Sequence, residues 1–175
     1  LCLVGSEMCI RDSSYPYRSS MSKTMVNNFK ELALKIKRKF IYKKVLEIGC
    51  NDGAFLKHFN DIALGVEPCG NIAKLAEKKK IKVISDYWTK KLANKIKSEY
   101  GLFDIIYSAN TLTHIKNLND VFKSINLVLN KNGVLIIEDP SLLECIKKNT
   151  YDQFYNEHIY VFSLISLSKI LKKFN

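Results

Sequence analysis

The feature that most constrains the fold is an apolar run that stops at a glycine, VLEIG at residues 45–49. The chain then passes Cys50, Asn51 and Asp52, reaches Gly53 and continues with apolar residues at 55, 56 and 59. This order is typical of a strand, a tight turn and a helix. Bare backbone at such a junction lets a ligand approach closely, and the helix N-terminus offers unpaired N–H groups. We therefore expect this turn to bind a nucleoside cofactor.

The rest of the chain alternates short apolar runs with amphipathic stretches. Four further runs predict strands at residues 63–66, 81–85, 103–109 and 134–137. Helices are expected at 22–40, 71–80, 90–100, 118–129, 141–148 and 167–174, and residues 130–133 predict a turn. Ser22 is a candidate N-cap of the first helix. Strands that alternate with helices favour a parallel sheet covered on both faces, so we expect an α/β, Rossmann-like three-layer sandwich with sheet order 3-2-1-4-5.

The chain divides into three parts. Residues 1–13 lack both lysine and a clear period and resemble translated sequencing-adapter sequence, so we expect a non-native leader; a short native arm is the alternative. Residues 14–42 predict a lead-in loop and helix. Residues 43–175 predict the cofactor-binding domain.

Charge and cysteine usage limit the function classes. The net charge of +11 comes mainly from lysines on the polar faces of expected helices, and no DNA or RNA recognition motif accompanies it. We therefore expect solvated helix surfaces and no nucleic-acid partner. No stretch approaches the roughly 20 apolar residues of a membrane helix. The five cysteines, Cys2, Cys9, Cys50, Cys69 and Cys145, show no CxxC spacing, so we expect free thiols, no metal or zinc site in this chain, and a cytoplasmic protein.

Acidic residues end the second and third expected strands, at the sheet edge where ligands of parallel sheets bind. Glu67, followed by Pro68, lies 20 residues after Glu47, where an acid can accept hydrogen bonds from ribose hydroxyls. Asp86 is placed to reach the exocyclic amine of adenine. The dinucleotide fingerprint G-x-G-x-x-G is absent, but Asn51, at the middle position, tolerates the left-handed backbone of a tight turn.

This layout resembles the class I S-adenosylmethionine methyltransferases over roughly residues 43–140. The resemblance implies that the turn accommodates the methionine part of the cofactor and that a residue after the fourth strand lies near the reacting methyl group. It also implies that a complete domain has two more strands, so we expect this one to be truncated before them. The cofactor-binding residues expected on these grounds are Glu47, Gly49, Cys50, Asn51, Gly53, Glu67, Pro68, Asp86 and Asn110.

The flanks carry a narrower resemblance. YPYRSSMS at residues 15–22, the GCNDG form of the turn, and the pattern Y-D-x-x-Y-x-E-H-x-x-x-F-S at 151–163 are similar to the sugar C-methyltransferases. That family methylates carbon on nucleotide-linked keto-deoxysugars and has an N-terminal zinc-binding segment and a C-terminal sugar-nucleotide-binding domain. The chain matches the central domain only, so we expect weak cofactor binding and no turnover by itself. Members more often have Ser in place of Cys50.

Methylation of carbon requires a base to remove a proton beside a keto group and a donor to stabilise the enolate oxygen. The run YNEH at residues 155–158 supplies both: His158 as base, Glu157 as its orienting partner and Tyr155 as donor. Adjacent residues of a strand point to opposite faces, so this hypothesis requires a loop or helical turn there. The resemblance adds His114 and Tyr17 as site residues.

Plainer interpretations stand beside these. Glu157 and His158 taken alone form an ordinary solvated pair, the two tyrosines at 15 and 17 can pack over the sheet, and Trp88 can cover the sheet edge. At the level of function, an O- or N-methyltransferase of the same fold and a non-catalytic binding domain are the alternatives. The sequence does not specify the oligomeric state.

Overall fold

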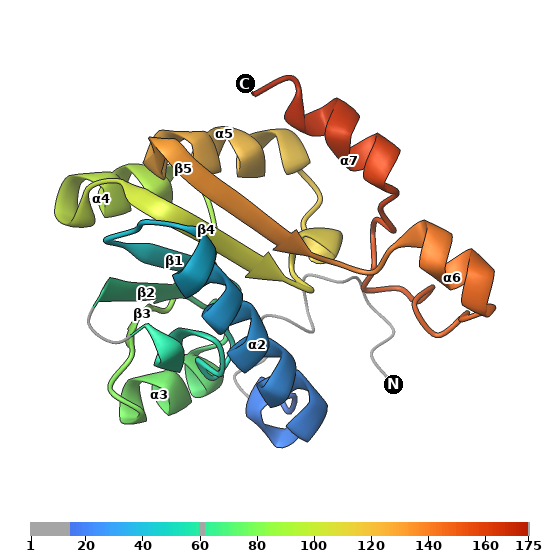
Figure 1. Ribbon diagram of the computed structural model, residues 1–175, viewed down its shortest axis with the longest axis horizontal. Helices are drawn as coiled ribbons and strands as arrows, with labels where there is room; N and C mark the ends of the chain where they lie inside the picture. Colours follow the sequence, from blue (N-terminus) through green and yellow to red (C-terminus); the bar gives the residue numbers. More distant parts are fainter. Residues whose placement is uncertain (1–14, 60–61, 175) are drawn as a thin grey trace.

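The architecture is a five-stranded parallel sheet with helices on both faces, seen in a computed structural model that describes residues 15–59 and 62–174. The sheet order is β3-β2-β1-β4-β5, with every neighbouring pair parallel (Figure 1). The strands are β1 (Val45–Ile48), β2 (Ala63–Val66), β3 (Lys82–Ile84), β4 (Phe103–Ala109) and β5 (Leu129–Glu138). The predicted fold class and sheet order are confirmed. The expected leader, residues 1–13, lies outside the described residues.

The helices form the two outer layers of the sandwich. They are α2 (Lys23–Lys39), α3 (Gly70–Lys78), α4 (Lys90–Tyr100), α5 (Leu118–Val128), α6 (Leu142–Lys148) and α7 (Leu164–Leu171), with short 3-10 turns η1 (Ser19–Met21), η2 (Leu56–His58) and η4 (Leu112–His114). Helices α4 and α5 cover one face of the sheet and α2 and α3 the other (Figure 1). The hydroxyl of Ser22 accepts a hydrogen bond from Met25 N at 3.3 Å, which confirms the predicted N-cap.

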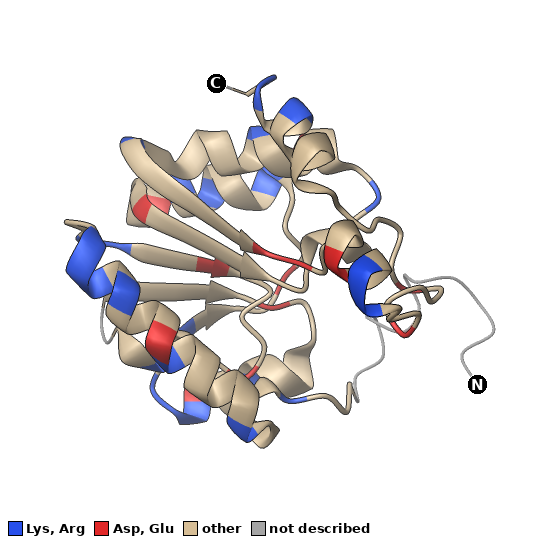
Figure 2. Ribbon diagram, turned by 45° about the vertical axis from the view of Figure 1, so that its right-hand side comes forward, with Lys and Arg blue, Asp and Glu red and all other residues tan. Residues whose placement is uncertain are grey.

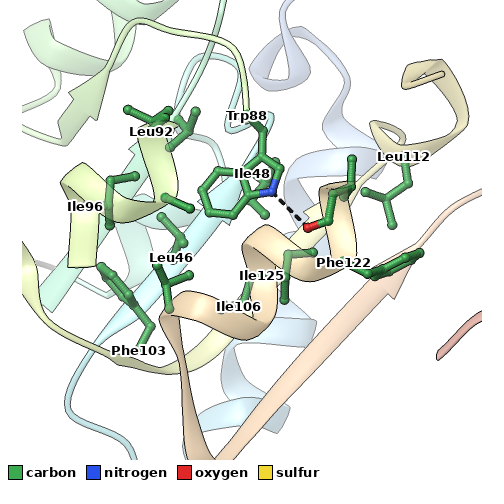
Figure 3. Close-up of a cluster of buried hydrophobic side chains, with 14 of the residues drawn as sticks. Leu46, Ile48, Trp88, Leu92, Ile96, Phe103, Ile106, Leu112, Phe122 and Ile125 are labelled. Carbon is green, nitrogen blue, oxygen red and sulfur yellow. Dashed lines mark hydrogen bonds between the residues drawn. The ribbon is translucent and has the colours of Figure 1, made fainter. Parts of the chain in front are cut away.

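Two hydrophobic cores hold these layers together. The first packs Leu46 and Ile48 of β1 against Ile96 of α4 and Phe122 and Ile125 of α5 (Figure 3). Trp88 belongs to this core, and its Nε1 donates to Val121 O at 3.3 Å, so the indole N–H is satisfied inside the protein. The second core, on the other face, consists of side chains of α2, α3 and β4 around η2: Phe29, Ala33, Ile36, Phe55, Phe59, Ala76 and Tyr107.

The predicted helix after the cofactor turn is wrong in extent. Only the 3-10 turn Leu56–His58 forms there. Ala54, Phe55, Leu56 and Phe59 are all buried, and only Lys57 of residues 54–59 is exposed, so the segment lacks the broad polar face of an amphipathic helix. Its shape is set by the aromatic cluster in which the Phe55 ring lies 4.2 Å from that of Tyr107.

The predicted turn at residues 130–133 lies inside β5. Leu129 pairs with Phe103, the register then shifts, and Val134 pairs with Ile105. Asn130 Nδ2 donates to Asp104 Oδ1 at 2.9 Å, which ties the irregular stretch to β4. The polar run therefore forms an irregularity within a strand, of the kind common at sheet edges, rather than a turn that precedes it.

Charge is distributed unevenly over the fold. Basic residues lie along the outer helices, whereas acidic positions gather around the carboxyl ends of the strands (Figure 2). Among the described residues, no helix has the length and apolarity needed to span a membrane.

Candidate functional site

A cavity of about 680 Å³ lies beyond the carboxyl ends of the central strands. Its walls come from segments far apart in the sequence: residues 15–19, two side chains of α2, the turn after β1, the end of β2, residues 87–88, residues 109–117, and residues 153–158. The position is where ligands bind in open α/β sheets. The predicted cofactor-binding residues that line it are Glu47, Gly49, Cys50, Asn51, Glu67, Pro68 and Asn110. The predicted catalytic residues that line it are Tyr17, His114, Tyr155, Glu157 and His158.

The turn after β1 forms because its backbone is held on β2. Gly49 N and Cys50 N both donate to Val66 O, at 2.8 and 3.1 Å. Gly49 has φ +75°, and a Cβ built there would lie 2.1 Å from Thr111 Oγ1, so glycine is required both for the backbone and for the close approach of the next loop. Gly53, also at positive φ, packs against Ile81 beneath the turn and does not line the cavity.

Two buried carboxylates face the cavity. Glu47 is 3% exposed, and its Oε2 has no hydrogen-bond partner among the residues that the structure describes. Burial, together with the nearby charges of Glu67 and Asp52, raises the pKa of Glu47 well above its usual value. An unpaired buried oxygen of this kind is available to a donor group of a ligand.

Glu67 is held more firmly. Its Oε2 accepts from Asn51 N and its Oε1 from Cys69 N, each at 2.9 Å. Burial raises the pKa of this carboxyl, while the two backbone N–H groups lower it in part. Each carboxylate oxygen retains a second lone pair, so the bonds that fix Glu67 leave it able to accept from ligand hydroxyls.

Asp86 lies outside the cavity. Its side chain is exposed, and Oδ1 accepts a hydrogen bond from Tyr87 N at 2.7 Å, so it caps its own loop. Tyr87 and Trp88 line the cavity at this position instead. Trp88 both packs in the core and forms part of the cavity wall.

The loop after β4 supports the other side of the cavity. Asn110 has φ +47° and its N donates to Glu138 O at 2.8 Å, which turns the chain sharply into η4. Thr113 O then accepts from Ile159 N at 2.9 Å, which ties the segment 151–160 onto this loop. His114 donates from Nδ1 to Glu157 O at 2.8 Å, since a carbonyl can only accept. Burial lowers the pKa of His114, which favours its neutral form.

Tyr155 and His158 form one hydrogen-bonded unit. His158 N donates to Tyr155 O at 2.9 Å, so residues 155–158 form the turn that the hypothesis requires. The ring of His158 donates from Nδ1 to Gln153 O at 2.8 Å, which leaves the Nε2 lone pair of the neutral ring to accept from Tyr155 Oη at 2.9 Å. The His114 and His158 rings lie 4.9 Å apart.

The partner of the His158 Nδ1 atom is the carbonyl of Gln153, not the carboxylate of Glu157. Both ring nitrogens of His158 have other partners, and the Glu157 carboxylate lines the cavity near Tyr155 and Tyr15. A backbone carbonyl has no sequence signature, so Gln153 could not have been found from the pattern. Tyr15 also lines the cavity, and burial together with the charges of Glu157, Cys69, Tyr155 and Glu67 raises its pKa to about 12.

Comparison with known proteins agrees with this geometry. The family model described as "Methyltransferase domain" matches residues 17–175. C-methyltransferase NovU of Streptomyces niveus is 30% identical over 131 residues, which cover 73% of this chain and 31% of that protein. Sterol 4-C-methyltransferase strm-1 of Caenorhabditis elegans is 33% identical over 119 residues, covering 65% of this chain and 34% of that protein. The chain thus spans about a third of the length of these relatives.

Solved structures show the same fold at lower identity. The plantazolicin methyltransferase BpumL, in complex with S-adenosylhomocysteine (SAH), superposes with a TM-score of 0.69 over 96% of this chain and 72% of that one, at 15% identity. A SAM-dependent methyltransferase from Thermotoga maritima gives a TM-score of 0.62 over 85% of this chain and 72% of that one, at 22% identity. With a family model that matches nearly the whole described chain, the protein belongs to the methyltransferase-domain family.

Proposed function

We propose that this chain is the central domain of an enzyme that methylates a carbon atom of a nucleotide-linked keto-deoxysugar with S-adenosylmethionine. The observation that carries the proposal is the Tyr155–His158 pair, which faces the same cavity as the buried acids Glu47 and Glu67. The two curated relatives, named as C-methyltransferases, support transfer to carbon. The sugar as acceptor rests on the tyrosine-containing segments at 15–22 and 151–163.

The residues present fit the cofactor. The unpaired Oε2 of Glu47 offers an acceptor for a ligand ammonium or N–H group, and Glu67 offers acceptors for ribose hydroxyls. Gly49 keeps the backbone of the turn bare, and Asn110 flanks the opposite wall. S-adenosylmethionine, when bound, supplies an electrophilic methyl group on sulfonium sulfur. The turn would hold the cofactor so that this methyl faces the 153–158 loop.

His158 is suited to the role of base because its tautomer is fixed. The bond from Nδ1 to Gln153 O presents the basic Nε2 to the cavity side, where Tyr155 currently donates to it. Removal of a proton from the carbon beside the keto group leaves an enolate, whose carbon takes the methyl group as the methyl–sulfur bond breaks. The proton then resides on Nε2 of His158.

Tyr155 supplies the donor in the same unit. Burial and the charge of Glu157 raise the pKa of its phenol, so the hydroxyl stays protonated and can donate. Donation to a substrate oxygen requires the hydroxyl to exchange its partner, from His158 Nε2 to the enolate oxygen. That exchange frees Nε2 when substrate arrives, so binding and activation of the base would be linked.

The proposal is tested with the protein at the full length of its gene and S-adenosylmethionine carrying a ¹³C-methyl group. Nucleotide-linked 4-keto-deoxysugars are the acceptors to use, with the matching 4-hydroxy sugars as controls that lack an acidic C–H. We expect a ¹³C-methyl group bonded to ring carbon, seen by heteronuclear NMR, from the keto sugars alone. A methoxy or N-methyl product would overturn carbon transfer and favour an O- or N-methyltransferase. Absence of SAH binding would instead favour the non-catalytic domain.

A further inference from the structure

The side chains of Asn51 and Asp52 bind the N-terminal segment, although both residues belong to the cofactor turn. Asn51 Oδ1 accepts from Ser19 N and from Asp52 N, each at 2.9 Å, and Asn51 Nδ2 donates to Tyr17 O at 3.4 Å. Ser20 donates from its hydroxyl to Asp52 Oδ2. The turn therefore contacts the segment through both side chains, which bond two of its backbone groups and the hydroxyl of Ser20.

The burial of Asp52 at this position lowers the stability of the protein unless its side chain is paired. Asp52 is 1% exposed. Lys79 Nζ lies 2.9 Å from its Oδ2 and donates also to Asp52 O. The hydroxyl of Ser20 donates to the same oxygen, so the segment supplies one of the partners of this buried carboxylate.

A third anchor holds the beginning of the segment. Asn71 Nδ2, from α3, donates to Tyr15 O at 3.0 Å. Tyr15 and Tyr17 both line the cavity, together with Glu67 of the β2 end and Tyr155 and Glu157 of the 153–158 loop. The segment thus closes the cavity between the turn and the 153–158 loop.

We propose that Asn51 and Asp52 are positioning residues that form a latch, which holds residues 15–20 closed over the cofactor site and keeps Tyr15 and Tyr17 facing the substrate. The latch is connected to the ligand through the backbone, because Asn51 N donates to Glu67 Oε2. A cofactor bound to Glu67 therefore stabilises the conformation of Asn51 that closes the segment. This coupling, unlike the latch itself, rests on the proposed function.

Cleavage by trypsin after Arg18 measures opening of the latch. Arg18 is exposed and lies between the latched residues, and cleavage of a native chain tracks the population of its open form. Asn51→Gly removes the side chain while keeping the left-handed backbone (φ +48°), and Ser20→Ala removes one hydroxyl without touching the turn. Asn149→Gly is the matched control, because Asn149 is also left-handed (φ +50°) and caps α6, away from the segment.

Without ligand, we expect Asn51→Gly to raise the initial rate of cleavage after Arg18 on the order of tenfold and Ser20→Ala severalfold, since each lost hydrogen bond shifts the opening equilibrium. Asn149→Gly should cleave there like the wild type. Equal rates in all four proteins, with unchanged urea midpoints, would overturn the latch. If Asn51→Gly unfolds, the Ser20→Ala rate decides.

Addition of SAH tests the coupling. The wild type should be protected after Arg18 severalfold, and Asn51→Gly much less. Wild type that binds SAH by calorimetry without any protection would overturn the coupling. Wild type that does not bind SAH would count against the proposed function, whereas the ligand-free comparison would still decide the latch.

Discussion

The hydroxyl of Tyr155 lies 2.9 Å from Nε2 of His158, while the other ring nitrogen of that histidine donates to a backbone carbonyl. The basic nitrogen is therefore fixed in its direction by the fold, before any substrate binds. Tyr155 occupies this nitrogen in the structure, and in the proposed reaction a substrate oxygen would take the place of that contact. The first two predictions concern His158 of this pair and Gly49 of the turn opposite it.

Replacement of His158 by Asn should remove methyl transfer and spare the cofactor. General-base catalysis typically contributes 10²- to 10⁴-fold, so we expect a loss of roughly that size in the rate of transfer from S-adenosylmethionine to a keto-sugar nucleotide. His158 lies in the 153–158 loop, across the cavity from the turn, so the affinity for SAH should stay within about twofold, a change worth only about 0.4 kcal/mol.

The matched control for this variant is His58→Asn, because His58 lies in η2 and does not line the cavity. His58→Asn should retain full transfer. A His158→Asn enzyme with wild-type turnover would remove His158 as the base and direct attention to His114, whose ring lies 4.9 Å away.

Replacement of Gly49 by Ala should destabilise the domain, whereas Gly70→Ala should not. At Gly49 the backbone has φ +75° and a Cβ would meet Thr111, so we expect a loss of about 1–3 kcal/mol in the free energy of unfolding. Gly70 begins α3 with no such φ, and its Cβ would meet only Ser85 Oγ, at 3.6 Å, so Ala there should be neutral or slightly stabilising. Urea denaturation of both variants checks the difference, and equal midpoints would contradict the assigned crowding.

The stability of the domain should fall as pH rises through 7, in part because of Asp139. Both of its carboxylate oxygens are buried. Burial raises its pKa from 3.8 to about 7, although the backbone N–H groups of Thr113 and Thr111 offset part of the rise. A raised folded-state pKa gives stability that is fully present below about 3.8 and is lost as the pH rises through 7.

Asp139→Asn keeps the shape of the side chain without its charge. Relative to wild type, this variant should gain on the order of 2 kcal/mol at pH 8, where the gain has levelled off, and only a small fraction of that at pH 4. Glu47 and Glu67 also have raised pKa values, so the difference between variant and wild type is the quantity to follow across pH. Asp152→Asn, at an exposed acid in the 151–160 segment, should show no such pH-dependent difference. A constant difference between Asp139→Asn and wild type would contradict the assignment.

Much of the fold was predictable because it depends on patterns that repeat. Apolar runs such as residues 103–109, separated by amphipathic stretches, predict a parallel sheet whatever the details of packing, and β4 has those bounds. The errors arose where tertiary contacts override local pattern. Residues 54–59 carry helical spacing, but four of the six are buried in the core and only a 3-10 turn forms, and residues 130–133 carry turn residues but are tied to β4 by Asp104.

The position of a site residue was predictable where its own side chain follows a strand and faces the cavity, as at Glu67. It was not predictable where the backbone acts. Gln153 holds His158 through a carbonyl that any residue possesses. Asp86 follows its strand as expected, yet its side chain caps the next backbone N–H instead of facing the cavity, because a short acidic side chain readily bonds its own loop.

Calorimetric titration with S-adenosylhomocysteine tests the central claim, that the cavity beyond β1 and β2 is a cofactor site, most directly. The experiment compares the wild-type chain with Glu67→Ala and, as a control, with Glu144→Gln, an exposed acid on α6. We predict one bound SAH per wild-type chain, unchanged affinity in Glu144→Gln, and a loss of at least about tenfold in Glu67→Ala, since an acceptor for ribose is removed and Asn51 N and Cys69 N lose their partner. Absence of binding to wild type, or equal affinity in Glu67→Ala, would contradict the claim.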